Sequence, residues 1–432
     1  MSNIETRRCS KRDSCVVHYR DPGPGMHEVA VDFGHGRKST FCVPSHLEFI
    51  RPLGSGAYGL VASFRDRRTD ELLAVKRMAN AFDDLDEGRR VLRELTLLRC
   101  LRHDNVVRMR CILPPASPRF EDVYVITEMM DTDLHRVIYS KQELLEEHQS
   151  KMMYQILRAL VYLHAASVVH RDLKPSNVLV DKEFGVKICD FGSAMPPVID
   201  GDVSAGITRW YRAPEVILLP AMCAAASDVW AAGCVLAEMV AREPLFRGSR
   251  NIDQLRRILE VLGRPCEDDL EWFPRSGKAV AFFSRCAALT RREWSEVLPQ
   301  ATGPAQELLT ATLQFDPQKR VAAADALRCS FFGRYFSGEE AERDAQATPV
   351  DWSFETSAAG GADALRRRIK ALAAEATPRP APAAAEAARG GPRRKLPVAR
   401  ENGVQRSLFE FTACIMLWVA VGFCVRKLSL RR

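Results

Sequence analysis

The stretch of sequence that decides the fold is His170-Arg171-Asp172-Leu173-Lys174-Pro175-Ser176-Asn177, and Asp190-Phe191-Gly192 follows it thirteen residues after the asparagine. Transfer of a phosphoryl group to a hydroxyl needs a carboxylate to receive the proton, a cation beside the phosphate, and oxygen ligands for Mg²⁺. We therefore expect Asp172 to accept the proton and Lys174 to lie over the γ-phosphate. Asn177 and Asp190 are the expected metal ligands.

Three earlier segments supply the other parts of such a site. Residues 53–61 read Leu53-Gly54-Ser55-Gly56-Ala57-Tyr58-Gly59-Leu60-Val61, in which glycines let backbone amides approach phosphates and Val61 covers the adenine base. Lys76 ends an alternating apolar strand, from which it can reach the α- and β-phosphates. Glu94 is expected on a helix as the ion-pair partner of Lys76. ATP and Mg²⁺ are therefore the predicted cofactors.

Taken together, these motifs resemble those of eukaryotic protein kinases. The resemblance implies an α+β, bilobal protein kinase fold with a β-rich N-lobe and a helical C-lobe. It also implies a buried structural pair between Glu215 of Ala213-Pro214-Glu215 and Arg320. Asp228 is expected to brace the catalytic loop from behind. The lysine, the catalytic aspartate and the metal aspartate are all present, which argues against a pseudokinase.

The segment from Asp122 to Leu134 resembles the hinge of mitogen-activated protein kinases. By this resemblance Thr127 is the gatekeeper, Glu128 and Met130 offer backbone groups to adenine, and Asp133 bonds the ribose. Residues 208–215, Thr-Arg-Trp-Tyr-Arg-Ala-Pro-Glu, extend the likeness to the proline-directed (CMGC) group. The implied substrates are serine or threonine followed by proline.

The activation segment departs from that family. Val203-Ser204-Ala205 stands where mitogen-activated kinases carry Thr-x-Tyr, so dual phosphorylation is excluded. We expect a kinase that is either set active by nearby aspartates or switched by Ser204. The Val203-Ser204 pair also resembles the glycogen synthase kinase branch, but Met195 replaces a lysine of that branch's phosphate-binding trio and leaves only Arg93 and Arg171. Dependence on a primed substrate is therefore not expected.

Composition narrows the remaining function classes. The chain has 432 residues, 47% of them hydrophobic, and a formal net charge of +7 whose basic excess lies mainly near the two ends. This distribution gives no nucleic-acid footprint. The thirteen cysteines form neither a paired disulfide framework nor a zinc pattern, which fits a reducing cytosol.

The chain divides into six expected parts. Residues 1–46 are expected to form a flexible extension with one strand near 28–33. The others are a kinase domain at 47–336, a C-terminal extension with a docked helix at 337–376, a disordered linker at 377–407, a membrane tail anchor at 408–425 and a basic tail at 426–432. In the docked helix, Leu365, Ile369 and Leu372 share one face, while Arg366, Arg367 and Lys370 are expected to point away.

The last apolar segment and the linker each leave alternatives open. Residues 411–425 are uncharged and predict an anchor in the cytosolic face of a mitochondrial outer membrane or another organelle; a buried helix or an amphipathic partner segment is the alternative. Residues 393–398 have the basic-then-apolar form of a docking peptide, or are a solvated charge run. The expected partners are protein substrates and an upstream kinase or docking partners. The alternative to an enzyme is a catalytically weak nucleotide-binding scaffold tethered to a membrane.

Overall fold

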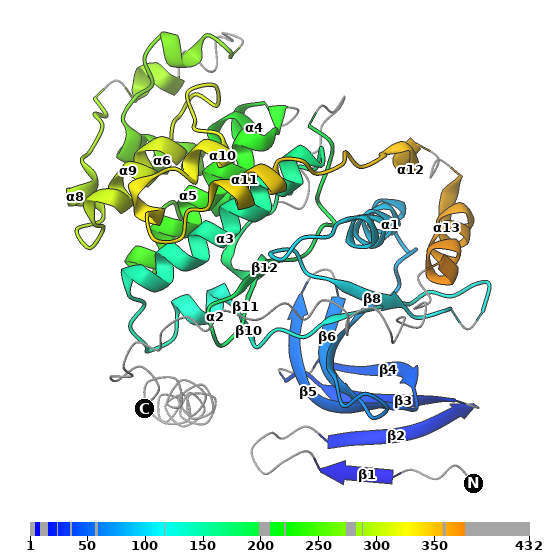
Figure 1. The fold of residues 1–432 in the computed structure, drawn as a ribbon. Coiled ribbons are helices and arrows are strands. Elements are labelled where there is room, and N and C mark those ends of the chain that lie inside the picture. The colour runs from blue at the N-terminus through cyan, green and yellow to red at the C-terminus, as the bar shows by residue number, and fades with distance from the viewer. Residues whose placement is uncertain are drawn as a thin grey trace, which may run out of the picture.

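The protein folds into a sheet-rich small lobe and a helical large lobe (Figure 1). The computed structural model describes residues 5–8, 16–23, 25–34, 37–56, 59–115, 117–197, 208–219, 222–273, 282–286, 288–356 and 360–375. The α+β, two-lobed architecture expected from the sequence is confirmed.

The small lobe is built on an antiparallel sheet of order β5-β6-β7-β9-β8. Its strands are β5 (Leu47–Gly56), β6 (Gly59–Asp66), β7 (Leu72–Met78), β8 (Met109–Ile112) and β9 (Val123–Glu128). Side chains alternate between the two faces of a strand, and in β7 Leu73 and Val75 are buried in one hydrophobic cluster. Because Lys76 lies on β7, this sheet fixes its position at the cleft between the lobes.

Helix α1 (Leu85–Cys100) packs beside this sheet. The Asp84 carboxylate caps its first turn by accepting a hydrogen bond from the backbone N–H of Asp86 at 2.8 Å. Val91, Leu95 and Leu98 recur at helical spacing and are buried. The helix therefore has one fixed apolar face, which sets the direction in which its other side chains point.

The strand expected near residues 28–33 forms as β3, but the expectation that it is the one strand of the N-terminal extension is wrong. Four strands form a sheet of order β1-β2-β3-β4, namely β1 (Glu5–Arg8), β2 (Val16–Gly23), β3 (Met26–Asp32) and β4 (Lys38–Pro44). Val29, Val31, Phe41 and Val43 are fully or almost fully buried in a cluster with Phe64 of β6. Because these apolar residues alternate along both strands, they bury one face of the hairpin against the kinase sheet.

The large lobe is mainly helical. Its helices are α2 (Leu134–Ile138), α3 (Glu146–Ala165), α4 (Pro214–Leu218), α5 (Ala225–Ala241), α6 (Asn251–Leu262), α8 (Trp294–Val297), α9 (Gly303–Thr312) and α10 (Ala323–Ala326), with 3-10 turns η1 (Pro175–Asn177), η2 (Arg209–Tyr211), η4 (Asp268–Leu270) and η5 (Ser330–Phe332). Helices α3 and α5 lie side by side at its centre. The loop at residues 170–177 follows α3 in the chain, and Asp228 of α5 accepts hydrogen bonds from it.

A small antiparallel sheet lies at the junction of the lobes, in the order β10-β11-β12. Its strands are β10 (Thr132–Asp133), β11 (Val178–Val180) and β12 (Val186–Ile188). Val178 pairs with Ile188, so the residues just outside this pair, Asn177 and Cys189, lie at one end of the hairpin. The backbone N–H of Cys189 donates to the Asn177 carbonyl at 3.0 Å.

The C-terminal extension returns from the large lobe to α1 (Figure 1). It contains α11 (Gly338–Asp344), α12 (Ser353–Thr356) and α13 (Gly361–Glu375). Leu365 and Ile369 of α13 are buried, and Leu365 lies so close to Gly88 of α1 that a Cβ there would come within 2.8 Å of the leucine Cδ1. A glycine in α1 thus lets the two helices pack closely.

The expectation that Arg366 points away from this interface is wrong. Its guanidinium lies 4.5 Å from the centre of the Phe82 ring, and its Nε donates to the Phe120 carbonyl at 3.0 Å. An arginine can bury its methylene stem and stack its planar head on an aromatic face while keeping its hydrogen bonds. Helical spacing therefore indicated a solvent-facing position for Arg366, whereas its side chain packs against Phe82.

Among the residues that the structure describes, no helix is both long and apolar enough to cross a membrane. The expected linker at 377–407, anchor at 408–425 and basic tail at 426–432 lie outside the described residues, as does the docking-type segment at 393–398.

Candidate active site

Lys76 and Glu94 meet across the interface between β7 and α1. The Lys76 Nζ donates to the two Glu94 carboxylate oxygens at 2.6 and 2.8 Å. It also lies 3.9 Å from Oδ1 of Asp190. Burial lowers the pKa of Lys76, but the two carboxylates more than offset it, so the pKa lies above its ordinary value. Lys76 is thus held as a fixed cation beside an expected metal ligand.

Asp172 is buried at the centre of a network of donors. Its Oδ2 accepts from Nζ of Lys174 at 2.6 Å, and its Oδ1 accepts from the backbone N–H of Thr208 at 3.1 Å. The Asn177 amide donates to the Asp172 carbonyl at 2.8 Å and to Oδ2 at 3.3 Å. Lys174 also donates to the Thr208 hydroxyl at 2.8 Å. The carboxylate is therefore oriented from two sides.

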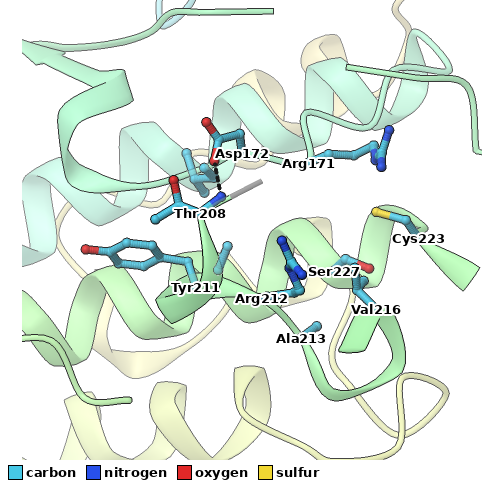
Figure 2. Close-up of a pocket in the computed structure, with 11 residues that line it drawn as sticks. Arg171, Asp172, Thr208, Tyr211, Arg212, Ala213, Val216, Cys223 and Ser227 are labelled. Atoms are coloured by element: carbon cyan, nitrogen blue, oxygen red, sulfur yellow. Dashed lines mark hydrogen bonds between the residues drawn. The ribbon is translucent and has the colours of Figure 1, made fainter. Parts of the chain in front are cut away.

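Figure 2 shows the Asp172–Thr208 hydrogen bond at the edge of a pocket that Arg171, Tyr211 and Arg212 also line. The pocket lies between the catalytic loop and the segment that leads into α4. Thr208 thus couples the position of Asp172 to the end of the activation segment. The residues from 198 to 207, including Ser204 and the two nearby aspartates, lie outside the described residues.

Asp228, at the start of α5, braces the catalytic loop from behind, as the resemblance implied. Its carboxylate accepts the backbone N–H groups of His170 and Arg171, both at 2.8 Å, and a contact from His164 Nε2 at 3.0 Å. Burial acts to raise the pKa of Asp228, but the hydrogen bond and charge of His164 and the backbone bonds outweigh it, so the pKa lies below its ordinary value. Arg171 adopts a φ of +69° within this bend.

Asn177 and Asp190 fit the metal that the resemblance implies. Because the Asn177 amide nitrogen bonds to Asp172, the oxygen of the same side chain is the atom suited to a hard cation. Hairpin β11–β12 places Asp190 near it, with a φ of +67°. No cluster of three or more His, Cys, Asp or Glu side chains that could hold a metal occurs among the described residues. Mg²⁺ commonly binds through one or two protein ligands plus water and substrate phosphates, and the oxygens of Asn177 and Asp190 are ligands of that kind.

The glycine-rich hairpin joins β5 to β6. Gly54 pairs with Val61, Ser55 with Leu60, and Gly56 with Gly59. Gly59 has a φ of +135°, and a Cβ there would come within 2.5 Å of the Arg77 carbonyl oxygen, so only glycine fits. Ala57 and Tyr58, at the tip, lie outside the described residues.

Leu53 and Asp133 are linked through Arg136. The Asp133 carboxylate caps α2 by accepting the Arg136 backbone N–H at 2.9 Å, and Nη2 of Arg136 donates to the Leu53 carbonyl at 2.7 Å. This connects the start of the hairpin to the opposite lobe. The expected ribose ligand is therefore already a helix cap through Oδ1, and its Oδ2 lies 3.3 Å from Nε of Arg136. A carboxylate has about four acceptor sites, so it can still accept a hydrogen bond from a ribose hydroxyl.

The two expected adenine contacts lie at the end of β9. The backbone N–H of Glu128 donates to the Arg108 carbonyl at 3.0 Å. This N–H is therefore already hydrogen-bonded within the protein. The Glu128 carboxylate accepts the Arg108 N–H at 2.7 Å and pairs with Lys187 at 3.1 Å. Met130 follows the strand and is half-buried.

The contacts of two residues near the site, Thr208 and Glu355, were not predicted from the sequence. Thr208 bonds both Asp172 and Lys174, and its place in the Thr-Arg-Trp-Tyr motif was the only signal for it. Glu355 forms a fork with Arg93, from which it is 262 residues distant. No local pattern could have connected two positions so far apart.

Comparison of the sequence with known proteins identifies similar kinases. The model of the protein kinase domain family matches residues 47–332. The chain is 42% identical over 312 residues to mitogen-activated protein kinase 5 of Oryza sativa subsp. indica, covering 72% of the chain and 84% of that protein. It is 42% identical over 287 residues to mitogen-activated protein kinase 3 of Arabidopsis thaliana, with 66% and 77% covered, and 44% identical over 280 residues to mitogen-activated protein kinase 10 of the same plant, with 64% and 71% covered.

Proposed function

The chain belongs to the protein kinase family, among the mitogen-activated protein kinases, and on this premise we propose that the cleft between its lobes is the site of phosphoryl transfer from ATP. Membership makes it a serine/threonine protein kinase. Five charged or amide side chains would carry the reaction: Lys76, Asp172, Lys174, Asn177 and Asp190.

Each of these side chains has a separate task in the proposal. Lys76 would hold the α- and β-phosphates, because Glu94 fixes its ammonium group at 2.6 Å. Asp172 would orient the substrate hydroxyl and receive its proton as the oxygen attacks the γ-phosphorus, while the bond from that phosphorus to the β–γ bridging oxygen breaks and ADP leaves. Lys174, bonded to the same carboxylate, would offset the charge of the transferred group. Bound Mg²⁺, held by Asn177 and Asp190, would neutralise phosphate charge.

One observation carries the assignment. A single ammonium group, that of Lys76, lies within 4 Å of both Glu94 on α1 and Asp190 on the other side of the cleft. The anchor for the nucleotide and the metal ligand are therefore already adjacent. A nucleotide-binding scaffold is the alternative, and it would keep this pair but transfer no phosphate. Transfer of labelled phosphate from ATP to myelin basic protein by the purified chain separates the two.

We propose serine or threonine followed by proline as the acceptor sequence. The support is the fixed position of the segment before Arg212: the Arg209 guanidinium donates to the Ser249 carbonyl at 2.9 Å, and the Trp210 indole N–H donates to the Gly248 carbonyl at 3.3 Å. In an oriented peptide library, proline after the acceptor is expected to raise kcat/KM roughly tenfold or more over alanine, the range that one pocket contact supplies.

Two sets of peptides make this test specific. Peptides with proline before the acceptor serve as the matched control and should show no gain. Peptides that carry phosphoserine beside the acceptor should not be preferred, because the Arg93 guanidinium is already bonded to Glu355 and to the Gly192 carbonyl. Equal rates for proline and alanine after the acceptor would remove the proline-directed assignment.

We also propose that residues 408–425 attach the kinase to the cytosolic face of a mitochondrial or other organelle membrane. The support is the sequence alone: fifteen uncharged residues from 411 to 425, followed by a basic tail. The stretch is somewhat short for a bilayer core of about 30 Å. Full-length protein expressed in cells is expected to stay in the membrane pellet after alkaline carbonate washing, whereas a chain ending at residue 407 should be released. Release of the full-length chain as well would dismiss the anchor.

A further inference from the structure

Arg93 of α1 connects three segments of the chain. Its Nε and Nη2 donate to the two carboxylate oxygens of Glu355 at 2.5 and 3.0 Å, and its Nη1 donates to the Gly192 carbonyl at 2.8 Å. The exposed fractions of the two side chains are 11% and 22%. A two-pronged bond of this kind fixes a guanidinium in direction as well as in distance.

The carboxylate in this fork is held by the large lobe. Helix α12, which carries Glu355, follows a segment in which the Val350 N–H donates to the Ala166 carbonyl at 2.9 Å. The Trp352 indole N–H donates to the Ser167 carbonyl at 3.0 Å, and its ring stacks on buried Phe354 at 5.5 Å. Ala166 is the C-cap of α3 and Ser167 follows it directly. Glu355 therefore joins α1 of the small lobe to a fixed point on the large lobe.

The position of α1 decides whether Glu94 can meet Lys76. Arg93 and Glu94 are neighbours on one helix, so a rotation of α1 that moves one of them moves the other. A bond from Arg93 to Gly192 also connects the helix to the turn that carries Asp190. The hydrogen bonds of Arg93 thus restrain Glu94 through α1 and Asp190 through the turn at Gly192. These are the two carboxylates beside the Lys76 ammonium.

The anion in this fork is a permanent part of the chain. Residues 203–205 read Val-Ser-Ala, so the threonine and tyrosine of a Thr-x-Tyr motif are absent there, and Ser204 is the hydroxyl that could acquire a phosphate. Glu355 carries its carboxyl group as part of the chain, so no upstream enzyme has to add it. The contact with Glu355 can therefore restrain α1 in the unphosphorylated chain.

We propose that Glu355 is a positioning residue for phosphoryl transfer: through Arg93 it holds α1 with Glu94 against Lys76, without a phosphate on the activation segment. The inference rests on the proposed roles of Lys76 and Glu94. Glu355 itself is not placed near the nucleotide, and it acts only through the arginine.

The test compares Glu355→Gln with Glu375→Gln in full-length protein treated with phosphatase. Glu375 forms another ion pair between the same extension and α1, with Arg99, and it does not contact Arg93. We expect Glu355→Gln to lower kcat/KM for ATP about tenfold, because a charge-assisted fork becomes a neutral contact. Glu375→Gln should match wild type. Thermal unfolding midpoints close to wild type would show that neither change acts by unfolding the domain.

A second background separates positioning from general packing. In Arg93→Met, which has already lost the guanidinium, adding Glu355→Gln should cause no further loss, whereas Glu355→Asp in the wild-type background should recover part of the activity. If Glu355→Gln also lowered kcat/KM for ATP tenfold in the Arg93→Met background, the proposal would be overturned. Wild-type rates in Glu355→Gln, or loss of wild-type activity on phosphatase treatment, would overturn it as well. A wild-type chain that transfers no phosphate before that treatment would instead count against the proposed function.

Discussion

Asp172→Asn is expected to lower kcat for phosphate transfer about a thousandfold, within the range that a positioned proton acceptor supplies. Asparagine keeps the size of the side chain and an oxygen that can accept the Thr208 N–H, which lies 3.1 Å from the native carboxylate. It removes the negative charge that orients Lys174 and the group that takes the proton. The nucleotide-binding side chains on the small lobe are unchanged, so KM for ATP should change little.

The measurement is transfer of labelled phosphate to myelin basic protein, with ATP affinity measured separately by titration. Alanine at 172 is a poorer choice, because it would strip the acceptor from Lys174 and Thr208 together. Asp325→Asn provides a matched control, since this aspartate is exposed on α10 of the same lobe. It should leave kcat unchanged.

Two results would contradict the assigned chemistry. Near-normal kcat in Asp172→Asn would show that this carboxylate is not the proton acceptor. A wild-type chain that binds ATP yet transfers no phosphate to any acceptor would favour the scaffold alternative, in which the Lys76–Glu94 pair serves nucleotide binding alone.

Motifs of fixed spacing could be predicted from the sequence because each one is a short segment with a defined backbone. The pairs Lys76–Glu94 and Glu215–Arg320 form in the structure, as does the contact of Asp228 with the catalytic loop. In each case a kinase-like order of motifs indicated the partner, although the partners of Glu215 lie far along the chain. The resemblance to the kinase motif series, and not local pattern alone, therefore made these contacts predictable.

The N-terminal sheet and the Arg93–Glu355 fork could not be predicted in the same way. Alternating Val29 and Val31, and Phe41 and Val43, do carry a strand signal, but the surrounding charges and the proline–glycine run favoured a flexible segment. What decides the outcome is burial against the kinase sheet, a tertiary effect. The fork depends on where α12 docks, and Glu355 has no local feature that separates it from any other surface glutamate.

Arg320→Met is expected to lower the free energy of unfolding of the large lobe by about 3–5 kcal/mol, the cost of leaving a buried partner charge uncompensated. The Arg320 guanidinium and the Glu215 carboxylate are 0% and 1% exposed, and they join through two bonds of 2.7 and 3.0 Å. Arg320 also donates to the Ala226 carbonyl at 2.7 Å and lies 5.1 Å from the Trp230 ring centre. Its loss strands a carboxylate that water cannot reach.

Denaturant titration followed by tryptophan fluorescence measures the change. The adjacent residue offers a matched control: Lys319 pairs with Asp269 at 2.7 Å, but the lysine side chain is 47% exposed, so Lys319→Met should move the midpoint little. Glu215→Gln combined with Arg320→Met should cost less than the sum of the single changes, because the double variant leaves no charge buried alone. Equal losses for Arg320→Met and Lys319→Met, or full additivity in the double variant, would show that the buried pair does not stabilise the lobe through mutual charge compensation.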